Sequence, residues 1–366
     1  MHANQFKSVY ARDSPGHIKK AVLAFQDHMT GDRVALNKTS IERRCLYYAK
    51  MPPSIFSKLL EMSNMSVTAH LIVGFGNFTF RESNSTNAFS RLLRLNDSGS
   101  PSIPQTHPPE GDFHPWQGFA YASLAGMNPE TEIPSAGANL RTLATNSSDI
   151  SMQGRGDFDL GHLLMAASFI VPDPSYKFRF DGETITLRQV GNRALLGHIQ
   201  NEESTCHHFH LTEGLCLASA RIPGMADLRT EAAEFLNRQL DVLNYVAVVL
   251  NKNLSECEVS VKELKILSKL VGHAIELAAI AQICGFDLSK SQKNALNFVA
   301  NASSVVFGVA MSPEHFSALA HYRRGSTLLL EIERARTEGR CLSTINLSSY
   351  SVNLDEMHRS DAGLIV

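Results

Sequence analysis

The chain has 366 residues, of which 43% are hydrophobic and 19% are charged, and its formal net charge is −2. This composition is typical of a globular protein with a substantial core, organised as one large domain or two ordinary ones. The near-neutral charge balance and the lack of a basic block argue against nucleic acid or an anionic membrane surface as a partner.

The N-terminal twenty residues lack the apolar region of a secretory signal, and no run of about 18 apolar residues predicts a transmembrane helix. The six cysteines are scattered along the chain without a Cys-x-x-Cys pair. This spacing favours free thiols in a reducing compartment over a disulfide framework. We therefore expect a cytoplasmic protein that does not span a membrane.

Polar segments at 81–89 and 96–115 are expected to be loops. The second could be a linker, but we predict a long surface or active-site loop over 96–113, because a repeat pattern runs across it. This gives one domain over residues 1–341. Residues 177–190 predict either a β-hairpin with its turn at Asp181-Gly182, or a loop that leads into a helix from Thr186.

Helical periodicity dominates the C-terminal half of the chain. Apolar residues recur near a 3.6-residue period over 233–251, which predicts one helix there. Residues 261–285 predict a helix, a short break near Gly272, and a second helix that stops at Gly285. Pro313 marks the start of a further helix over 312–336, and the serine-rich segment 342–366 is expected to be a loosely ordered tail.

Seven histidines each precede an apolar run that is rich in small residues, and three of the six successive separations are 48 residues. A period of about 48 residues predicts one helical hairpin per repeat. The histidines are His17, His70, His114, His162, His210, His273 and His321. Four residues after them come Ala21, Gly74, Gly118, Ala166, Gly214, Leu277 and Gly325.

A small residue one turn after each histidine lies on the same helix face and allows a neighbouring helix to approach closely. Runs that are apolar on most sides predict buried inner helices, and the more amphipathic segments between them predict an outer layer. We therefore predict an all-α fold, either an open solenoid or a closed α/α toroid of about seven helical hairpins. Near-equal spacing without polar capping repeats favours closure. The repeat histidines are expected at helix starts, in a structural role.

The pattern Gly/Phe-His-x-x-[Glu/Gln]-Gly resembles the His-Gly-x-x-Gly repeats of lanthionine synthetase C-like (LanC-like) proteins, from residue 14 to residue 336. The resemblance implies a seven-unit α/α toroid, a peptide substrate and a cyclase- or lyase-type tailoring reaction. That family binds zinc through two cysteines and a histidine. Here Trp116 has no adjacent cysteine, and the chain's single Cys-His pair, Cys206-His207, is followed by histidine rather than glycine.

The first candidate site is the sequence Cys206, His207, His208 and His210. Three imidazoles and a thiol within five residues can supply ligands for zinc or iron, and zinc is the metal we consider first. We expect these residues on a loop just before a buried helix. The alternative is a solvated polar loop in which His210 is structural.

The second candidate site lies in residues 111–121. Asp112 could orient His114 as a general base. Trp116, Gln117 and Tyr121 would then bind substrate. The alternative is a helix-capping aspartate beside a packed aromatic ring.

The third candidate site lies in residues 153–164. Asp157 and Asp159 precede His162, and two carboxylates with a histidine suit acid–base or metal-assisted chemistry. Arg155 could bind an anionic substrate group. The alternative is that Asp159 caps the following helix.

Glu213 and Glu276 each follow a repeat histidine by three residues, and would either face the same cavity as the other candidates or cap their own helices. Motifs for nucleotide binding and serine hydrolysis are missing from the sequence. We predict a peptide-tailoring cyclase or lyase, acting on a peptide or small molecule. Two alternatives stay open: a carbohydrate-active toroid that uses Trp116 and Tyr121 as a sugar platform, and a non-catalytic scaffold that binds a peptide. The sequence also leaves a homodimer open.

Overall fold

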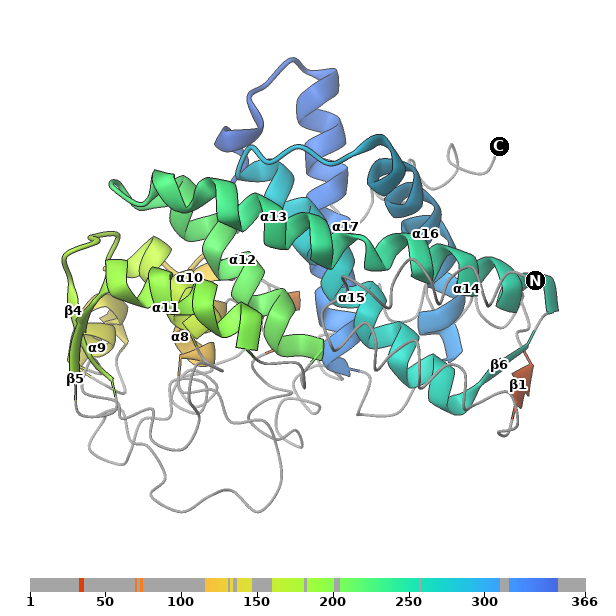
Figure 1. Cartoon of the computed structure of the whole chain (residues 1–366), viewed down its shortest axis with the longest axis horizontal. Helices are drawn as coiled ribbons and strands as arrows, with labels where there is room; N and C mark the ends of the chain where they lie inside the picture. Colours follow the sequence, from red (N-terminus) through yellow and green to blue (C-terminus); the bar gives the residue numbers. More distant parts are fainter. Residues whose placement is uncertain are drawn as a thin grey trace.

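The computed structural model describes residues 33–35, 70, 73–74, 116–130, 132–133, 137–146, 160–180, 183–200, 205–256, 258–309 and 316–347. These residues are mostly helical, with three short antiparallel strand pairs, which confirms the all-α class (Figure 1). The expected loops at 81–89 and 96–113, and the expected helix start at Pro313, lie outside the described residues.

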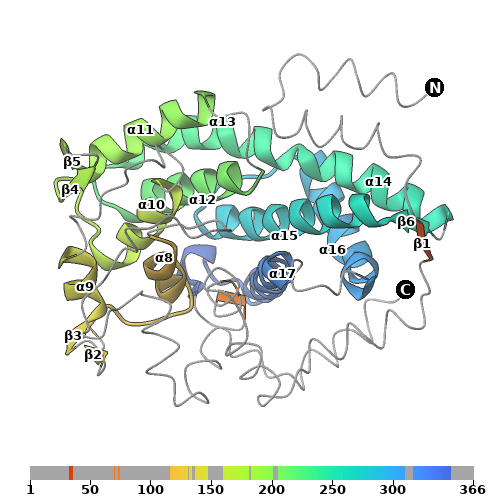
Figure 2. The same cartoon turned by 90° about the horizontal axis from the view of Figure 1, so that it is seen from below.

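Five described helices form an inner layer. They pack on one another in chain order, so that each contacts the next (Figure 2). All residues of the first and ten of the eleven residues of the second are buried, as expected for helices enclosed on most sides. The inner helices are α8 (Gln117–Leu124), α10 (Leu160–Ile170), α12 (Thr205–Arg221), α15 (Val261–Ile283) and α17 (Phe316–Thr337).

A sixth inner segment is described only at residues 70 and 73–74, where the backbone is helical. The ring of His70 contacts His321 of α17 on one side and Tyr121 of α8 on the other. Gly74 also lies against Ala320 of α17. This segment therefore connects the last inner helix with the first.

Outer helices cover the inner layer. They are α11 (Leu187–Gln200), α13 (Arg229–Leu240), α14 (Val242–Glu256) and α16 (Lys290–Val309), and the short α9 (Leu140–Asn146) packs on α10.

The helix predicted over 233–251 is confirmed in its helical character and wrong only at Asp241, where α13 and α14 meet end to end (Figure 1). Asp241 itself keeps helical backbone angles, with φ −61° and ψ −21°. The apolar period therefore continues across the joint, and a one-residue interruption leaves no trace in it.

The predicted break near Gly272 is also wrong, because α15 runs without interruption through this residue. Gly272 lies where the backbone carbonyl of Ala318 in α17 touches α15. The glycine is thus required by a close helix contact rather than by a helix end. Within the described part of the chain, the α15 window Ile266–Ile283 is long and apolar enough to cross a membrane, but it is 89% buried inside the protein.

The small residues that follow the repeat histidines allow close helix packing, as predicted. A Cβ atom added at Gly214 would lie 2.5 Å from the carbonyl oxygen of Gly161 in α10. One added at Gly325 would lie 2.5 Å from the backbone nitrogen of Glu276 in α15, and one at Gly74 would lie 2.7 Å from Cα of Ala320. At these positions, helix backbones touch without intervening side chains.

The hairpin predicted over 177–190 is confirmed. Strand β4 (Lys177–Phe180) pairs antiparallel with β5 (Glu183–Thr186), and Phe180 lies opposite Glu183. The turn residues 181–182 lie outside the described residues, and α11 begins directly after β5 at Leu187.

The remaining short elements include two more strand pairs: β1 (Arg33–Ala35) pairs with β6 (Glu258–Ser260), and β2 (Glu132–Ile133) with β3 (Ala138–Asn139). Two 3-10 helices, η3 (Ala226–Leu228) and η5 (Leu342–Thr344), complete the described elements. Ile345 and Leu347 are buried, so the packed structure continues past residue 342, where the tail was expected to begin.

Candidate functional site

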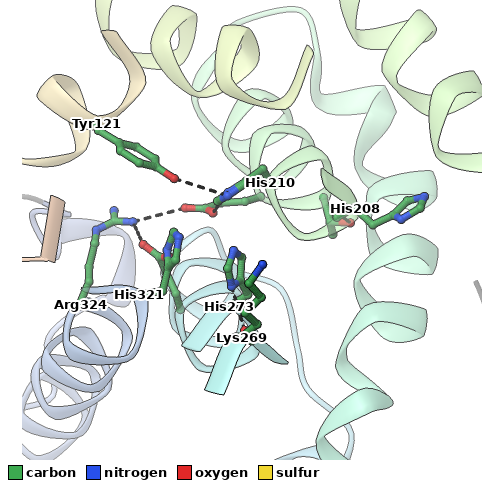
Figure 3. A network of polar contacts seen from close by, with 10 residues as sticks. Tyr121, His208, His210, Lys269, His273, His321 and Arg324 are labelled. Carbon is green, nitrogen blue, oxygen red and sulfur yellow. Dashed lines mark hydrogen bonds and ion pairs between the residues drawn. The ribbon is translucent and has the colours of Figure 1, made fainter. Parts of the chain in front are cut away.

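Six aromatic side chains, one from each inner segment, meet in the centre of the protein. Each of these residues is at most 6% exposed, and Figure 3 shows four of them converging. We call this arrangement the histidine ring. In order around it, the centroid separations are 5.2 Å for His70–Tyr121, 5.6 Å for Tyr121–His162, 4.6 Å for His162–His210, 5.0 Å for His210–His273, 4.0 Å for His273–His321 and 4.9 Å for His321–His70.

These side chains meet because of how the inner helices pack, and not because each of them lies at the start of its helix. His162 lies in the first turn of α10, as expected, but His210 is in the second turn of α12 and His273 is in the middle of α15. The glycine contacts set which turns of neighbouring helices face each other. Equivalent repeat positions therefore converge although the helices begin at different points.

A second polar layer lies one turn beyond the ring and consists of Glu213, Glu276 and Arg324. The guanidinium group of Arg324, which is fully buried, donates from Nη1 to Oε1 of Glu276 and, at 3.3 Å, to Oε1 of Glu213. We call this the Glu–Arg–Glu layer (Figure 3). Both glutamates face the protein interior together, which is one of the two placements that the sequence left open.

The Glu–Arg–Glu layer contacts the histidine ring through two carboxylate–imidazole pairs. Nδ1 of His321 donates to Oε2 of Glu276, and Nδ1 of His210 lies 3.7 Å from Oε2 of Glu213. A carboxylate on one ring nitrogen fixes the imidazole tautomer, so the other nitrogen carries the lone pair. In His321 this is Nε2, and in His210 it is Nε2 that faces the hydroxyl of Tyr121, at 3.4 Å.

Burial acts differently on the two glutamates. Burial raises the pKa of Glu213 well above its usual range, and the nearby Glu276 raises it further, against the opposing effect of Arg324. For Glu276, burial opposes ionisation, but His321 and Arg324 outweigh it and hold the pKa of this carboxyl below its usual value. Of the two buried carboxyl groups beside Arg324, Glu276 is therefore the one that ionises more readily.

Two of the ring histidines, His210 and His273, are shifted toward the neutral form. Burial lowers the pKa of His210 well below its usual value, and the neighbouring His162, His273, His321 and His70 lower it further. Burial likewise lowers the pKa of His273 to about 4, although its Nδ1 donates to the backbone carbonyl of Lys269 at 2.9 Å. A neutral imidazole is the form that binds a metal ion.

Three members of the ring are placed to share one metal ion. His70, His210 and His321 each offer a ring nitrogen, and these atoms lie within 4.8 Å of one another. Nitrogen ligands of a tetrahedral zinc ion, at about 2.0–2.1 Å from the metal, are about 3.3 Å apart. Small side-chain rotations would therefore bring the three nitrogens to ligand distance.

The sequence-predicted metal ligands on α12 do not all converge. His208 is two positions from His210, which is a rotation of about 200° around the helix, and Figure 3 shows the two side chains pointing in different directions. Cys206 and His207 belong to the first turn of α12 rather than to a preceding loop, and their side chains lie outside the described part of the structure. His210 is brought together with His70 and His321, not with His208.

The predicted substrate-binding aromatic residues are core residues in this structure. Trp116 is 4% exposed and its ring lies 5.4 Å from Phe119 and 5.6 Å from Phe178. Gln117 is buried in α8, and Tyr121 is part of the histidine ring. Asp112, His114, Arg155, Asp157 and Asp159 lie outside the described residues.

Sequence reasoning missed His70, His273, His321 and Arg324 as members of the site. The signal was present, since these histidines occupy one repeat position and Arg324 occupies the position of Glu213 and Glu276. The repeat histidines were expected to be structural, and for this reason they were not considered as members of a site. Where inner helices pack on one another in chain order, equivalent inward positions come close together.

Comparison with family models, curated proteins and solved structures finds no match to this chain. The LanC-like relationship therefore stays a prediction from the repeat pattern. Function has to be inferred from the histidine ring and the Glu–Arg–Glu layer.

Proposed function

We propose that this protein is a metal-dependent enzyme of the lyase or cyclase type, with a transition-metal ion held by His70, His210 and His321. The observation that carries the proposal is the convergence of three buried ring nitrogens within 4.8 Å. His321 also donates from Nδ1 to the carboxylate of Glu276, and Nδ1 of His210 lies 3.7 Å from Glu213. A histidine that binds a metal almost always donates its other ring nitrogen to a carboxylate, a backbone carbonyl or a water molecule, which orients the imidazole.

Three imidazole ligands leave room for water or substrate at the ion, as in catalytic zinc sites. When bound, the ion would supply a Lewis acid for a substrate carbonyl or a bound water. The chain itself orients the imidazoles and excludes bulk water by burying them. Glu213, one of the predicted catalytic residues, would move a proton at Oε2, the oxygen nearest His210.

The substrate we propose is a small molecule or an extended peptide segment. The ring side chains are almost completely buried, so a bulky folded substrate would not reach them. The peptide is the substrate that the LanC-like resemblance implies. The aromatic rings considered as a sugar platform, Trp116 and Tyr121, are both buried, so we do not retain a carbohydrate-active enzyme as a second candidate.

For the fold, we propose a single closed α/α toroid. The support is the cyclic order of contacts through the inner segments, completed where His70 lies between His321 and Tyr121. The first of the seven proposed units, which begins at His17, lies outside the described residues. We also propose a cytoplasmic location, since the cysteines with described side chains, Cys216, Cys284 and Cys341, are free thiols.

Metal analysis of the purified, untagged protein tests the proposed centre. We expect about one transition-metal ion per chain, bound in the wild type and lost in the double variant His70→Ala/His321→Ala. The matched control is His208→Ala. This substitution also removes a buried imidazole from α12, but the side chain of His208 points away from the histidine ring. This variant should retain the metal.

A further variant, Cys206→Ser/His207→Ala, separates the two possible ligand sets. If this variant loses the metal while His70→Ala/His321→Ala keeps it, the ion is bound at the start of α12 and the proposed centre is wrong. Circular dichroism of each variant distinguishes metal loss from unfolding. Failure of the wild type to bind zinc(II), cobalt(II) or iron(II) on reconstitution would also reject the proposal.

A further inference from the structure

We infer that Tyr121 is the fourth protein ligand of this centre and binds the ion through its phenolate oxygen, which makes iron the metal that the site suits best. This inference rests on the proposed metal centre and adds to it a ligand and a metal class. Tyr121 belongs to α8, which supplies the one member of the ring that is not a histidine.

The position of the phenol ring supports this role. Its centroid lies 5.2 Å from the ring of His70 and 6.2 Å from those of His210 and His321. Tyr121 therefore faces all three proposed imidazole ligands, from a different helix than any of them.

The hydroxyl oxygen lies at the distance expected of a neighbouring ligand. Oη of Tyr121 is 3.4 Å from Nε2 of His210, the nitrogen we assign as the ligand atom of this histidine. Two ligand atoms of a tetrahedral site with bonds of about 2.0–2.1 Å lie about 3.3 Å apart. An ion that binds Nε2 of His210 can therefore bind Oη of Tyr121 with little movement of either side chain.

Binding exchanges one set of interactions for another. The phenol O–H bond breaks, its proton leaves to solvent, and an oxygen–metal bond forms with both bonding electrons supplied by oxygen. The lone pair on Nε2 of His210, which faces the tyrosine hydroxyl in this structure, becomes available to the same ion. The phenolate adds one negative charge to a centre whose other ligands are neutral imidazoles.

The fourth ligand changes which metal suits the site. Three imidazoles and one phenolate would complete the four-coordinate shell that zinc prefers and would leave no position for substrate. Iron accepts five or six ligands, so four protein ligands leave positions open on it. The substrate would then bind directly to the ion, beside the ring members His162 and His273.

Loading the full-length protein with iron(III) gives a direct test, because an iron(III)–phenolate bond produces a charge-transfer absorption band in the visible region. We expect wild type and His208→Ala to bind iron and to show this band. Tyr121→Phe keeps the aromatic ring and removes only the oxygen. It should still bind iron through the three imidazoles, but without the band.

The possible results separate this inference from the proposed function. Iron bound by wild type without a visible band, or a band of equal intensity in Tyr121→Phe, overturns the role of Tyr121 and leaves the three-histidine centre standing. Absence of metal binding in the wild type rejects both. If Tyr121→Phe does not fold, resonance Raman spectra of the wild type still decide, because excitation in the band enhances phenolate vibrations only when a tyrosine binds the iron.

Discussion

His321 donates the hydrogen on Nδ1 to the carboxylate of Glu276, and this buried contact joins α17 to α15 directly beneath the histidine ring. The other oxygen of Glu276 accepts a hydrogen bond from Arg324, which also reaches Glu213. The buried guanidinium group of Arg324 thereby connects α12, α15 and α17. The stability of the centre should depend on this group.

Removing the guanidinium group should destabilise the protein strongly. Arg324→Met leaves the Glu276 carboxylate buried without its cation, and breaking a buried pair in this way costs about 3–5 kcal/mol. The variant Glu276→Gln/Arg324→Met removes both charges and should be more stable than the sum of the two single changes predicts. Urea unfolding of the four proteins measures the free energies; additive effects would show that the two groups are not coupled.

The contact at Gly325 should tolerate no side chain. Gly325→Ala places a Cβ atom 2.5 Å from the backbone nitrogen of Glu276, and overpacking of this kind typically costs about 1–3 kcal/mol. Gly191→Ala is the matched control, because its Cβ would meet only the side-chain ends of Met225 and Leu228, which can move. Thermal unfolding should show a larger decrease in Tm for Gly325→Ala; equal decreases would argue against close packing of α15 on α17.

Low pH should reduce the free energy of unfolding of the metal-free protein, because its buried histidines take up protons more readily in the unfolded state. The pKa of His273 is about 4 in the folded state, against about 6.5 in an unfolded chain. Between these values the unfolded state takes up a proton that the folded state does not, so the free energy of unfolding falls as pH falls, by about 1.4 kcal/mol per pH unit for one such histidine.

The variant His273→Gln isolates this effect. The raised pKa of Glu213 acts with the opposite sign, because protonation of this group favours the folded state as pH falls. The comparison is therefore between slopes: from pH 6.5 to pH 5 the stability of the wild type should decline more steeply than that of His273→Gln. Parallel slopes in urea titrations would show that His273 is not held neutral by burial.

Metal should stabilise the folded state by mass action. An ion that binds only the folded chain adds about 4 kcal/mol at a free concentration of a thousand times its Kd. We expect added iron(II) or zinc(II) to raise the Tm of wild type and of His208→Ala. The double variant His70→Ala/His321→Ala should show no such increase, and an increase of similar size in that variant would place the ion elsewhere.

Much of this architecture can be predicted from local sequence patterns. The 3.6-residue period indicates helices, and the Asp181-Gly182 pair between two short apolar segments indicates the hairpin of β4 and β5. The small residues at Gly214 and Gly325 indicate close helix contacts, which the structure has. Each of these features depends on residues near one another in the chain, or on the small size of a side chain, which allows any neighbouring helix to approach closely.

The joint between α13 and α14 and the continuity of α15 depend on tertiary structure. Asp241 interrupts the helices without changing their apolar period, while Gly272 resembles a helix end but serves a contact with Ala318. A glycine has the same local conformational freedom in both situations. Only the position of the neighbouring helix shows whether a glycine ends a helix or allows a close contact between two helices.

The composition of the site was also decided by tertiary structure. Local density of histidines in the sequence favoured His207 and His208 as partners of His210, but residues two apart on a helix point in different directions. The two histidines proposed to share a metal ion with His210 are 140 and 111 residues away, at His70 and His321. The sequence by itself determined that equivalent histidines recur on apolar helices. Helix packing determined that they share one centre, because the contacts between neighbouring inner segments turn equivalent positions toward the same point.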